Sequence, residues 1–128
     1  MRKRILLVDD EEGVLRLLEA TLGNNADYDL MVAHDGREAL DIAGREKPDL
    51  VILDMLMPML DGSAVCQTLK QNPSTSRTKV IMLTALTQHG DRLKALAAGA
   101  DHFMTKPFSP TTLLTKVDEM LSTHSRSA

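Results

Sequence analysis

Five polar side chains in this sequence stand where an apolar run stops, and together they have the chemistry of a phosphoryl-transfer site. The runs are RILLV, LVIL, KVIML and HFMT, and the residues that end them are Asp9 with Asp10, Asp54, Thr84 and Lys106. Three carboxylates at close quarters repel one another at neutral pH unless a cation or a proton neutralises them. Mg²⁺ prefers oxygen ligands, so the three aspartates are candidate metal ligands.

The hydroxyl and the ammonium complete this set. Beside a metal, an oxygen of Asp54 can act as a nucleophile toward a phosphoryl group. Phosphoryl transfer spreads negative charge over oxygens that Lys106 and Thr84 can stabilise, so the set suffices to make an aspartyl phosphate. A single acid here is more often a cap, and Asp10 suits the N-cap of the next helix. Four such strand ends in one chain favour function over capping.

The elements that position these residues alternate between strands and helices. Short apolar runs separated by helical patterns predict a parallel sheet, in which the carboxyl ends of the strands share one edge where ligands bind. The result is a three-layer α/β/α sandwich with right-handed crossovers. We expect strands at 4–8, 28–33, 50–54, 79–84 and 102–105, and helices at 11–24, 36–46, 63–71, 88–98 and from Ser109-Pro110 onward.

Apolar spacing also predicts which helix faces are buried. The fourth helix carries Leu93, Leu96, Ala97 and Ala100 at helical spacing, with Gly99 as a left-handed stop. The last helix is expected to turn four residues inward, and they are Leu113, Leu114, Val117 and Leu121. The polar stretch at 72–78 is predicted to be an exposed loop.

Composition places the chain among ordinary one-domain globular proteins. It has 128 residues and a net charge of −3, which gives no reason to expect direct nucleic-acid binding. Cys66 is the single cysteine, so it has no internal disulfide partner and is expected to be a buried thiol in a reducing cytoplasm. No apolar run is long enough for a signal peptide or a membrane span, so we expect a cytoplasmic location and no membrane partner.

Four segments, in order, resemble the motifs of the receiver domain of two-component response regulators. They are VDDEE, LDMLMPMLDG, MLTA and TKPF, and the resemblance covers residues 3 to 122. It implies a flavodoxin-like, five-stranded parallel sheet with the strand order 2-1-3-4-5. It also implies a receiver domain at 1–122, followed by a tail or linker stub at 123–128.

The resemblance assigns a role to each site residue. Asp54 would accept a phosphoryl group from the phosphohistidine of a sensor histidine kinase or a histidine phosphotransfer protein. Asp10 would bind Mg²⁺ directly, Asp9 mostly through water, and the carbonyl of Leu56 would be a backbone ligand. Such a domain modifies itself and slowly loses the phosphoryl group, but it is not an enzyme with a released product.

The family's switch would connect the phosphoryl group to an output surface. Thr84 and Lys106 would hold the phosphoryl oxygens, and a cis peptide is expected before Pro107. Movement of Thr84 would turn the ring of Phe103 inward and reshape the face made by the fourth helix, fifth strand and fifth helix. The signal would pass to a downstream effector protein or to an output domain absent from this chain.

Two departures from the family pattern lead to further expectations. Leu56 and Leu86 are apolar where the family often has polar groups, so neither would orient an attacking water, and we predict slow dephosphorylation. On the fourth-helix face Asp101 is present, but Thr112 and Lys116 stand where a glutamate and an arginine are usual. Dimerisation through that face therefore stays open.

Other classes of protein use the same groups. An aspartate phosphatase of the haloacid dehalogenase type would carry a D-x-D pattern on its first strand, whereas Asp9 and Asp10 are adjacent. A flavodoxin-like FMN carrier needs a phosphate-binding first loop, and the loop DDEEG would repel phosphate. A receiver that acts only as a scaffold is disfavoured because every site residue is in place.

Overall fold

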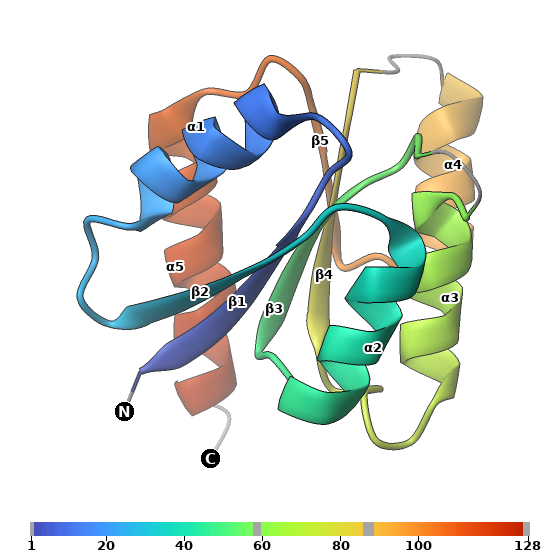
Figure 1. Cartoon of the computed structure of the whole chain (residues 1–128), viewed down its shortest axis with the longest axis horizontal. Helices are drawn as coiled ribbons and strands as arrows, with labels where there is room; N and C mark the ends of the chain where they lie inside the picture. The colour runs from blue at the N-terminus through green and yellow to red at the C-terminus, as the bar shows by residue number, and fades with distance from the viewer. Residues whose placement is uncertain (1, 58–59, 86–88, 127–128) are drawn as a thin grey trace.

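The computed structural model of the chain describes residues 2–57, 60–85 and 89–126, and within them five strands alternate with five helices (Figure 1). The strands are β1 (Lys3–Val8), β2 (Tyr28–Ala33), β3 (Leu50–Asp54), β4 (Lys79–Thr84) and β5 (His102–Thr105). The helices are α1 (Glu12–Leu22), α2 (Gly36–Glu46), α3 (Gly62–Gln71), α4 (His89–Ala97) and α5 (Pro110–Arg126).

The strands form one parallel sheet in the order β2-β1-β3-β4-β5, as predicted. Helices α1 and α5 cover one face, and α2, α3 and α4 cover the other (Figure 1). The strand order reverses direction beside β1, since β2 lies on one side of it and β3 on the other. In open α/β sheets this reversal opens a crevice at the carboxyl ends of the strands.

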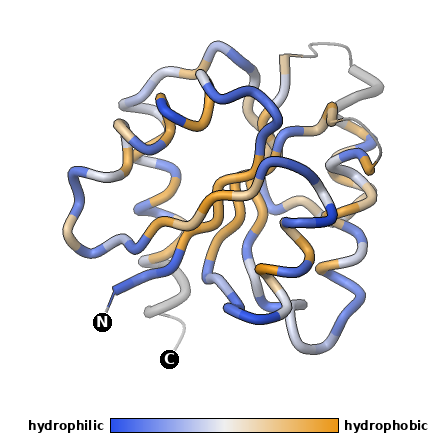
Figure 2. Tube along the Cα trace, viewed as in Figure 1, coloured by the Kyte–Doolittle hydropathy of each residue, from blue (hydrophilic) through white to orange (hydrophobic). Residues whose placement is uncertain are grey.

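Both faces of the sheet are buried, which explains why the central strands are apolar at nearly every position (Figure 2). Successive side chains of a strand point to opposite faces. Leu6 and Val8 therefore belong to the core on the α2–α4 side, and Ile5 and Leu7 to the core on the α1–α5 side.

Side-chain caps fix the starts of three helices, and at α5 the cap is Ser109, whose Oγ accepts a hydrogen bond from the N–H of Thr112 at 3.3 Å. Asp35 accepts a hydrogen bond from the backbone N–H of Glu38 at the start of α2, and Asp61 accepts one from Ala64 at the start of α3. Helix α1 differs from expectation, because its N-cap is Glu11 and no side chain caps it. Asp10 is therefore not the cap residue, which leaves its carboxylate available for another role.

The buried face of α4 was predicted wrongly in part. Leu93 and Leu96 are 53% and 49% exposed, whereas Ala95 is fully buried. The helix packs on the sheet through this small side chain, and a nine-residue helix with apolar residues on two faces does not reveal from spacing alone which face is buried. In α5, Leu113 is buried as expected, but Leu114 is 36% exposed.

The polar loop at 72–78 is only partly exposed, because two of its threonines are buried. Thr75 Oγ1 donates to Leu69 O at 2.8 Å, and Thr78 Oγ1 donates to Pro48 O at 2.8 Å. These bonds satisfy the hydroxyls and tie the loop to the neighbouring elements.

Element ends otherwise agree with the sequence to within one or two residues. Gly99 has a φ of 97°, the left-handed conformation expected after α4. The predicted start of α4 at Gln88 lies outside the described residues. Helix α5 continues to Arg126, so the boundary at residue 122 stays a prediction. None of the helices in the described part combines the length and apolar character that crossing a bilayer requires.

Candidate functional site

Three carboxylates gather at the carboxyl edge of the sheet. One oxygen each from Asp9, Asp10 and Asp54 lies within 4.8 Å of the others. Asp9 follows β1 and Asp54 ends β3, two strands that pair directly in the sheet. Asp9 and Asp54 are 1% and 3% exposed, whereas Asp10 faces solvent. The topology therefore brings together the acids that the sequence places 44 to 45 positions apart.

Local backbone contacts hold the two buried acids. Asp9 Oδ1 accepts a hydrogen bond from the N–H of Glu11 at 2.9 Å, which fixes this side chain against the start of α1. Beside Asp54, the N–H of Gly62 donates to Met55 O at 2.9 Å. A Cβ atom on Gly62 would lie 2.2 Å from the Asp54 carbonyl oxygen, so only glycine permits this approach.

Lys106 supplies the positive charge of the pocket. Its Nζ lies 2.8 Å from Asp9 Oδ2 and 3.5 Å from Asp54 Oδ1. Burial alone would lower the pKa of Lys106, but the hydrogen bond with Asp9 and the attraction of Asp54 outweigh it and raise that pKa. The backbone places this side chain through a bond from Lys106 N to Thr84 O, and the following peptide to Pro107 is cis, as expected.

The pKa of Asp54 is raised to about 6 by burial and, next, by repulsion from Asp9. Attraction by Lys106 and a hydrogen bond from the N–H of Leu56 to Asp54 Oδ1, at 3.3 Å, partly oppose this rise. The carboxylate is therefore unstable as an isolated buried anion and would be stabilised by additional positive charge.

Thr84 and Phe103 lie on the neighbouring strands. Thr84 is fully buried at the end of β4, one position beyond Leu83, which pairs with Asp54. It also pairs with Thr105 on β5. Phe103 is half-buried on β5 and packs against the core on the α2–α4 side. The threonine, the lysine and the acids thus share one edge, and Phe103 lies on β5, the strand that Lys106 follows.

Of the two leucines expected beside the phosphoryl group, the structure describes Leu56. Leu56 is 55% exposed, so its side chain covers the pocket only in part. Leu86 lies outside the described residues, and the expectation that rests on it stays a prediction.

Two residues make contacts that the sequence motifs did not indicate, one at the site and one at the opposite edge of the sheet. Glu11 Oε1 lies 3.5 Å from Lys106 Nζ, and the run of four acids that begins at Asp9 is the signal that could have predicted this contact. Asp101, which directly precedes β5, accepts hydrogen bonds at 2.8 Å from Lys70 Nζ and from the N–H of Val80. This carboxylate ties α3 to β4 within the chain.

The donor set fits a hard divalent cation. Three carboxylates face one ammonium, which leaves an excess of negative charge in a pocket where two of the acids are buried. Asp9 Oδ2 is buried and has no hydrogen bond of regular geometry, although Lys106 is close enough to pair with it. Oxygen ligands of this kind suit Mg²⁺, and the exposed Asp10 leaves room for bound water.

Comparison with known proteins gives the same picture for the whole chain. The family model described as "Response regulator receiver domain" matches residues 5–118. The alkaline phosphatase synthesis transcriptional regulatory protein PhoP of Bacillus subtilis is 45% identical over 94% of this chain, which spans 49% of that protein.

Two solved structures extend the comparison. A CheY-like receiver domain protein of Methanospirillum hungatei matches with a TM-score of 0.92 at 27% identity, over all of both chains. Chemotaxis protein CheY4 of Vibrio cholerae matches with a TM-score of 0.86 at 31% identity, over 94% of this chain and 99% of that one.

Proposed function

The chain belongs to the response regulator receiver domain family of two-component systems, and we propose that Asp54 is the residue through which it serves the family's phosphoacceptor function. The observation that carries this proposal is the position of Asp54, a buried carboxylate at a strand end that Lys106 and two further acids approach. Receiver domains are signalling domains rather than enzymes in the usual sense.

Asp9, Asp10 and Asp54 would hold Mg²⁺, with the carbonyl of Leu56 as a backbone ligand. The ion would offset the carboxylate charge and polarise the incoming phosphoryl group. Asp9 is fixed by the N–H of Glu11, so it is oriented before any ion binds. Asp10 has no such restraint from a helix cap and is exposed, which suits a ligand that reaches the ion directly.

In the transfer step, an oxygen of Asp54 attacks the phosphorus of a phosphohistidine. The new P–O bond forms as the P–N bond breaks, and the imidazole leaves with the electron pair of that bond and takes up a proton. Lys106, already 3.5 Å from Asp54, and the hydroxyl of Thr84 stabilise the charge on the phosphoryl oxygens. Lys106 would exchange part of its contact with Asp9 for one with the phosphoryl group.

Thr84 and Phe103 would form the switch. Their strands are neighbours, and Met82, two residues before Thr84, pairs with Phe103 in the register. A shift of the threonine hydroxyl toward the phosphoryl group would vacate space for the half-buried ring, which changes the face formed by α4, β5 and α5. The exposed Leu93, Leu96 and Leu114 on these helices are candidates for contacts with an effector.

The donor would be a sensor histidine kinase or a histidine phosphotransfer protein, and the location cytoplasmic. The chain spans about half the length of the Bacillus relative, so an output domain or a separate effector protein would deliver the signal. Self-dephosphorylation would be slow, because the leucine at position 56 offers no polar group to orient water.

Phosphorylation by a small acyl phosphate with Mg²⁺ tests the assignment of Asp54. Wild-type protein should gain the mass of one phosphoryl group and lose it to hydroxylamine, which cleaves acyl phosphates. Asp54→Asn should gain none, whereas Asp41→Asn, a change of an exposed aspartate on α2, should behave as wild type. Hydroxylamine-sensitive phosphorylation that persists in Asp54→Asn would disprove the assignment.

A further inference from the structure

The opposite edge of the sheet, where the strands begin, holds a cavity of about 120 Å³. Its walls come from the first residue of β1, the α2–β3 connection, the α3–β4 connection and the start of β4. Four of the lining side chains are cationic, and they are Lys3, Lys47, Arg77 and Lys79. None of them belongs to the acidic pocket at the carboxyl edge.

Backbone and hydroxyl bonds hold these walls together. Asp49 N donates to Arg4 O at 2.8 Å, and Lys79 N donates to Asp49 O at 3.1 Å. Buried Thr78 closes the same corner through its hydroxyl bond to Pro48 O at 2.8 Å. Hydrogen bonds to the sheet edge and between the connections therefore hold the loops that line the cavity.

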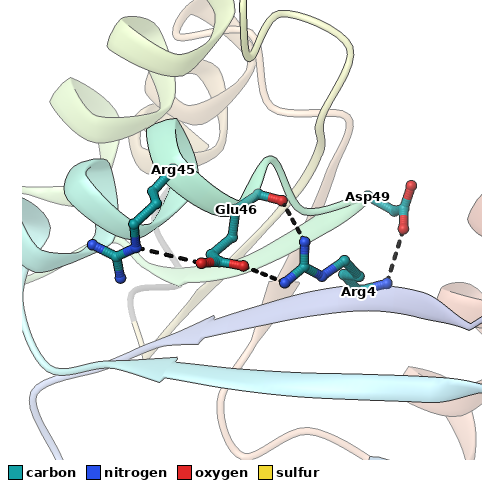
Figure 3. Close-up of polar contacts among 4 residues, drawn as sticks. All are labelled: Arg4, Arg45, Glu46 and Asp49. Carbon is teal, nitrogen blue, oxygen red and sulfur yellow. Dashed lines mark hydrogen bonds and ion pairs between the residues drawn. The ribbon is translucent and has the colours of Figure 1, made fainter.

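The acids at this edge already have partners, as Figure 3 shows. The carboxylate of Glu46 binds the guanidinium groups of Arg4 and Arg45, and the hydrogen bond from Arg4 holds its pKa below the usual range. Asp49 Oδ2 accepts a hydrogen bond from Arg4 N at 2.8 Å. Glu46 thus pairs with arginines outside the cavity lining, and Asp49 is the one acid among the lining residues.

The four cations of the cavity lack such partners. The ion pairs of the described residues involve Arg4, Arg45, His34 and lysines elsewhere, and none includes the lysines or the arginine that line this cavity. Four positive charges therefore surround one carboxylate. Unpaired cations that converge on a concave site raise the local concentration of anions.

Lys47 adds a backbone observation. It follows α2 with a φ of 49°, a left-handed conformation that glycine usually supplies at this position. Glycine would take this conformation without steric cost. The chain instead keeps a charged side chain there, at the wall of the cavity.

We propose that this cavity binds a compact oxyanion of the phosphate or pyrophosphate class. The charge balance selects an anion with two or more negative charges, and lysine and arginine are the side chains that bind phosphate oxygens best. The cavity volume of about 120 Å³ is small beside the roughly 300–1,000 Å³ of pockets that enclose drug-sized ligands. This size favours an anion of one or two phosphoryl groups over a ligand that would also place a nucleoside inside the cavity.

NMR titration of ¹⁵N-labelled protein in EDTA tests this proposal, with phosphate, pyrophosphate and adenosine diphosphate as probes. Without Mg²⁺ the acidic pocket repels these anions. We expect saturable shifts at Lys47, Thr78 and Lys79, with pyrophosphate and adenosine diphosphate binding equally well. Tighter binding of the nucleotide would overturn the size argument. Shifts centred on Asp9 and Asp54, or no saturation up to tens of millimolar, would overturn the proposal.

Two substitutions separate binding from folding. Lys47→Gly removes a charge and also the steric cost of a left-handed backbone at a residue with a side chain. Arg77→Gln removes the charge of an exposed side chain. Each should weaken pyrophosphate binding about fivefold or more, without lowering the urea midpoint. Arg16→Gln, on the exposed side of α1, should leave affinity unchanged. If all three variants bind pyrophosphate as tightly as the wild type, these cations only complement the charge of helix ends, and the anion site is refuted.

Discussion

Asp54, the proposed phosphoacceptor, is expected to cost stability, because it is buried close to Asp9 and its pKa is raised. We predict that Asp54→Asn stabilises the protein in EDTA at pH 7 by about 1–2 kcal/mol, since the amide keeps the shape of the side chain and removes the repulsion. Urea unfolding measures this change. Asp41→Asn, on the exposed side of α2, should change stability by less than about 0.5 kcal/mol. A destabilised Asp54→Asn would show that the contact with Lys106 outweighs the repulsion.

Cys66 is a buried thiol without a disulfide partner, as the sequence predicted. Burial raises its pKa to about 11, with a smaller opposing effect of Lys70 and a smaller reinforcing effect of Asp101. A raised thiol pKa means that the folded state holds its proton longer than the unfolded state. Stability from this group is therefore complete below the unfolded pKa of about 8.5 and is lost as the pH rises toward 11.

We predict that Cys66 reacts with a disulfide reagent at pH 8 at least about 100-fold more slowly in the native protein than in urea, because the thiolate is scarce and enclosed. The absorbance of the released thiol follows the reaction. A native rate equal to the unfolded rate would show that this part of α3 opens readily.

At the scale of the element, α4 presents leucines to solvent instead of to the core. Leu96 is 49% exposed, whereas Leu18 on α1 is 1% exposed. We predict that Leu96→Ala changes the free energy of unfolding by less than about 1 kcal/mol, whereas Leu18→Ala costs about 2–5 kcal/mol. Chemical denaturation of the two variants provides the comparison. Equal losses would mean that Leu96 packs in the core.

Asp101 and Lys70 join elements that the sequence could not pair. Asp101 accepts bonds from Lys70 Nζ and from the N–H of Val80, both at 2.8 Å, and Lys70 Nζ also donates to Thr78 O. We predict that Asp101→Ala destabilises the fold by about 1–2 kcal/mol, because the N–H of Val80 loses this acceptor and Lys70 Nζ keeps only its bond to Thr78 O. Denaturant unfolding measures the loss, and an unchanged midpoint would assign Asp101 to a surface role.

The strands were predictable because each apolar run stops at a polar residue, and parallel pairing then determines that Asp9 and Asp54 meet. The end of α4 and the start of α5 followed from Gly99 and from Ser109-Pro110. Other features depend on how elements pack, which a local pattern does not contain. The exposed face of α4 and the buried hydroxyl of Thr78 are set by neighbours distant in sequence.

Over the whole molecule, the two edges of the sheet gather side chains of opposite charge. The carboxyl edge gathers acids around Lys106, and the amino edge gathers unpaired cations around Asp49. Asp9, Asp54 and Lys106 stand at strand ends, so their motifs are visible in the sequence. The cations of the amino edge come from scattered loop and strand positions without a common motif, and only the folded chain brings them together.

Because the acidic pocket exists only in the folded chain, a cation that binds there must shift the unfolding equilibrium of the entire domain. We predict that Mg²⁺ at about ten times its dissociation constant raises the free energy of unfolding by about 1.4 kcal/mol. For a domain of this size the melting temperature should rise by about 3–6 °C.

Asp10→Asn removes an exposed acid that no helix cap requires, so it should lose most of this effect while folding normally. Asp41→Asn should keep it. Calorimetric melts at matched ionic strength measure the shift, and the same rise in NaCl would attribute it to general screening instead of a bound ion.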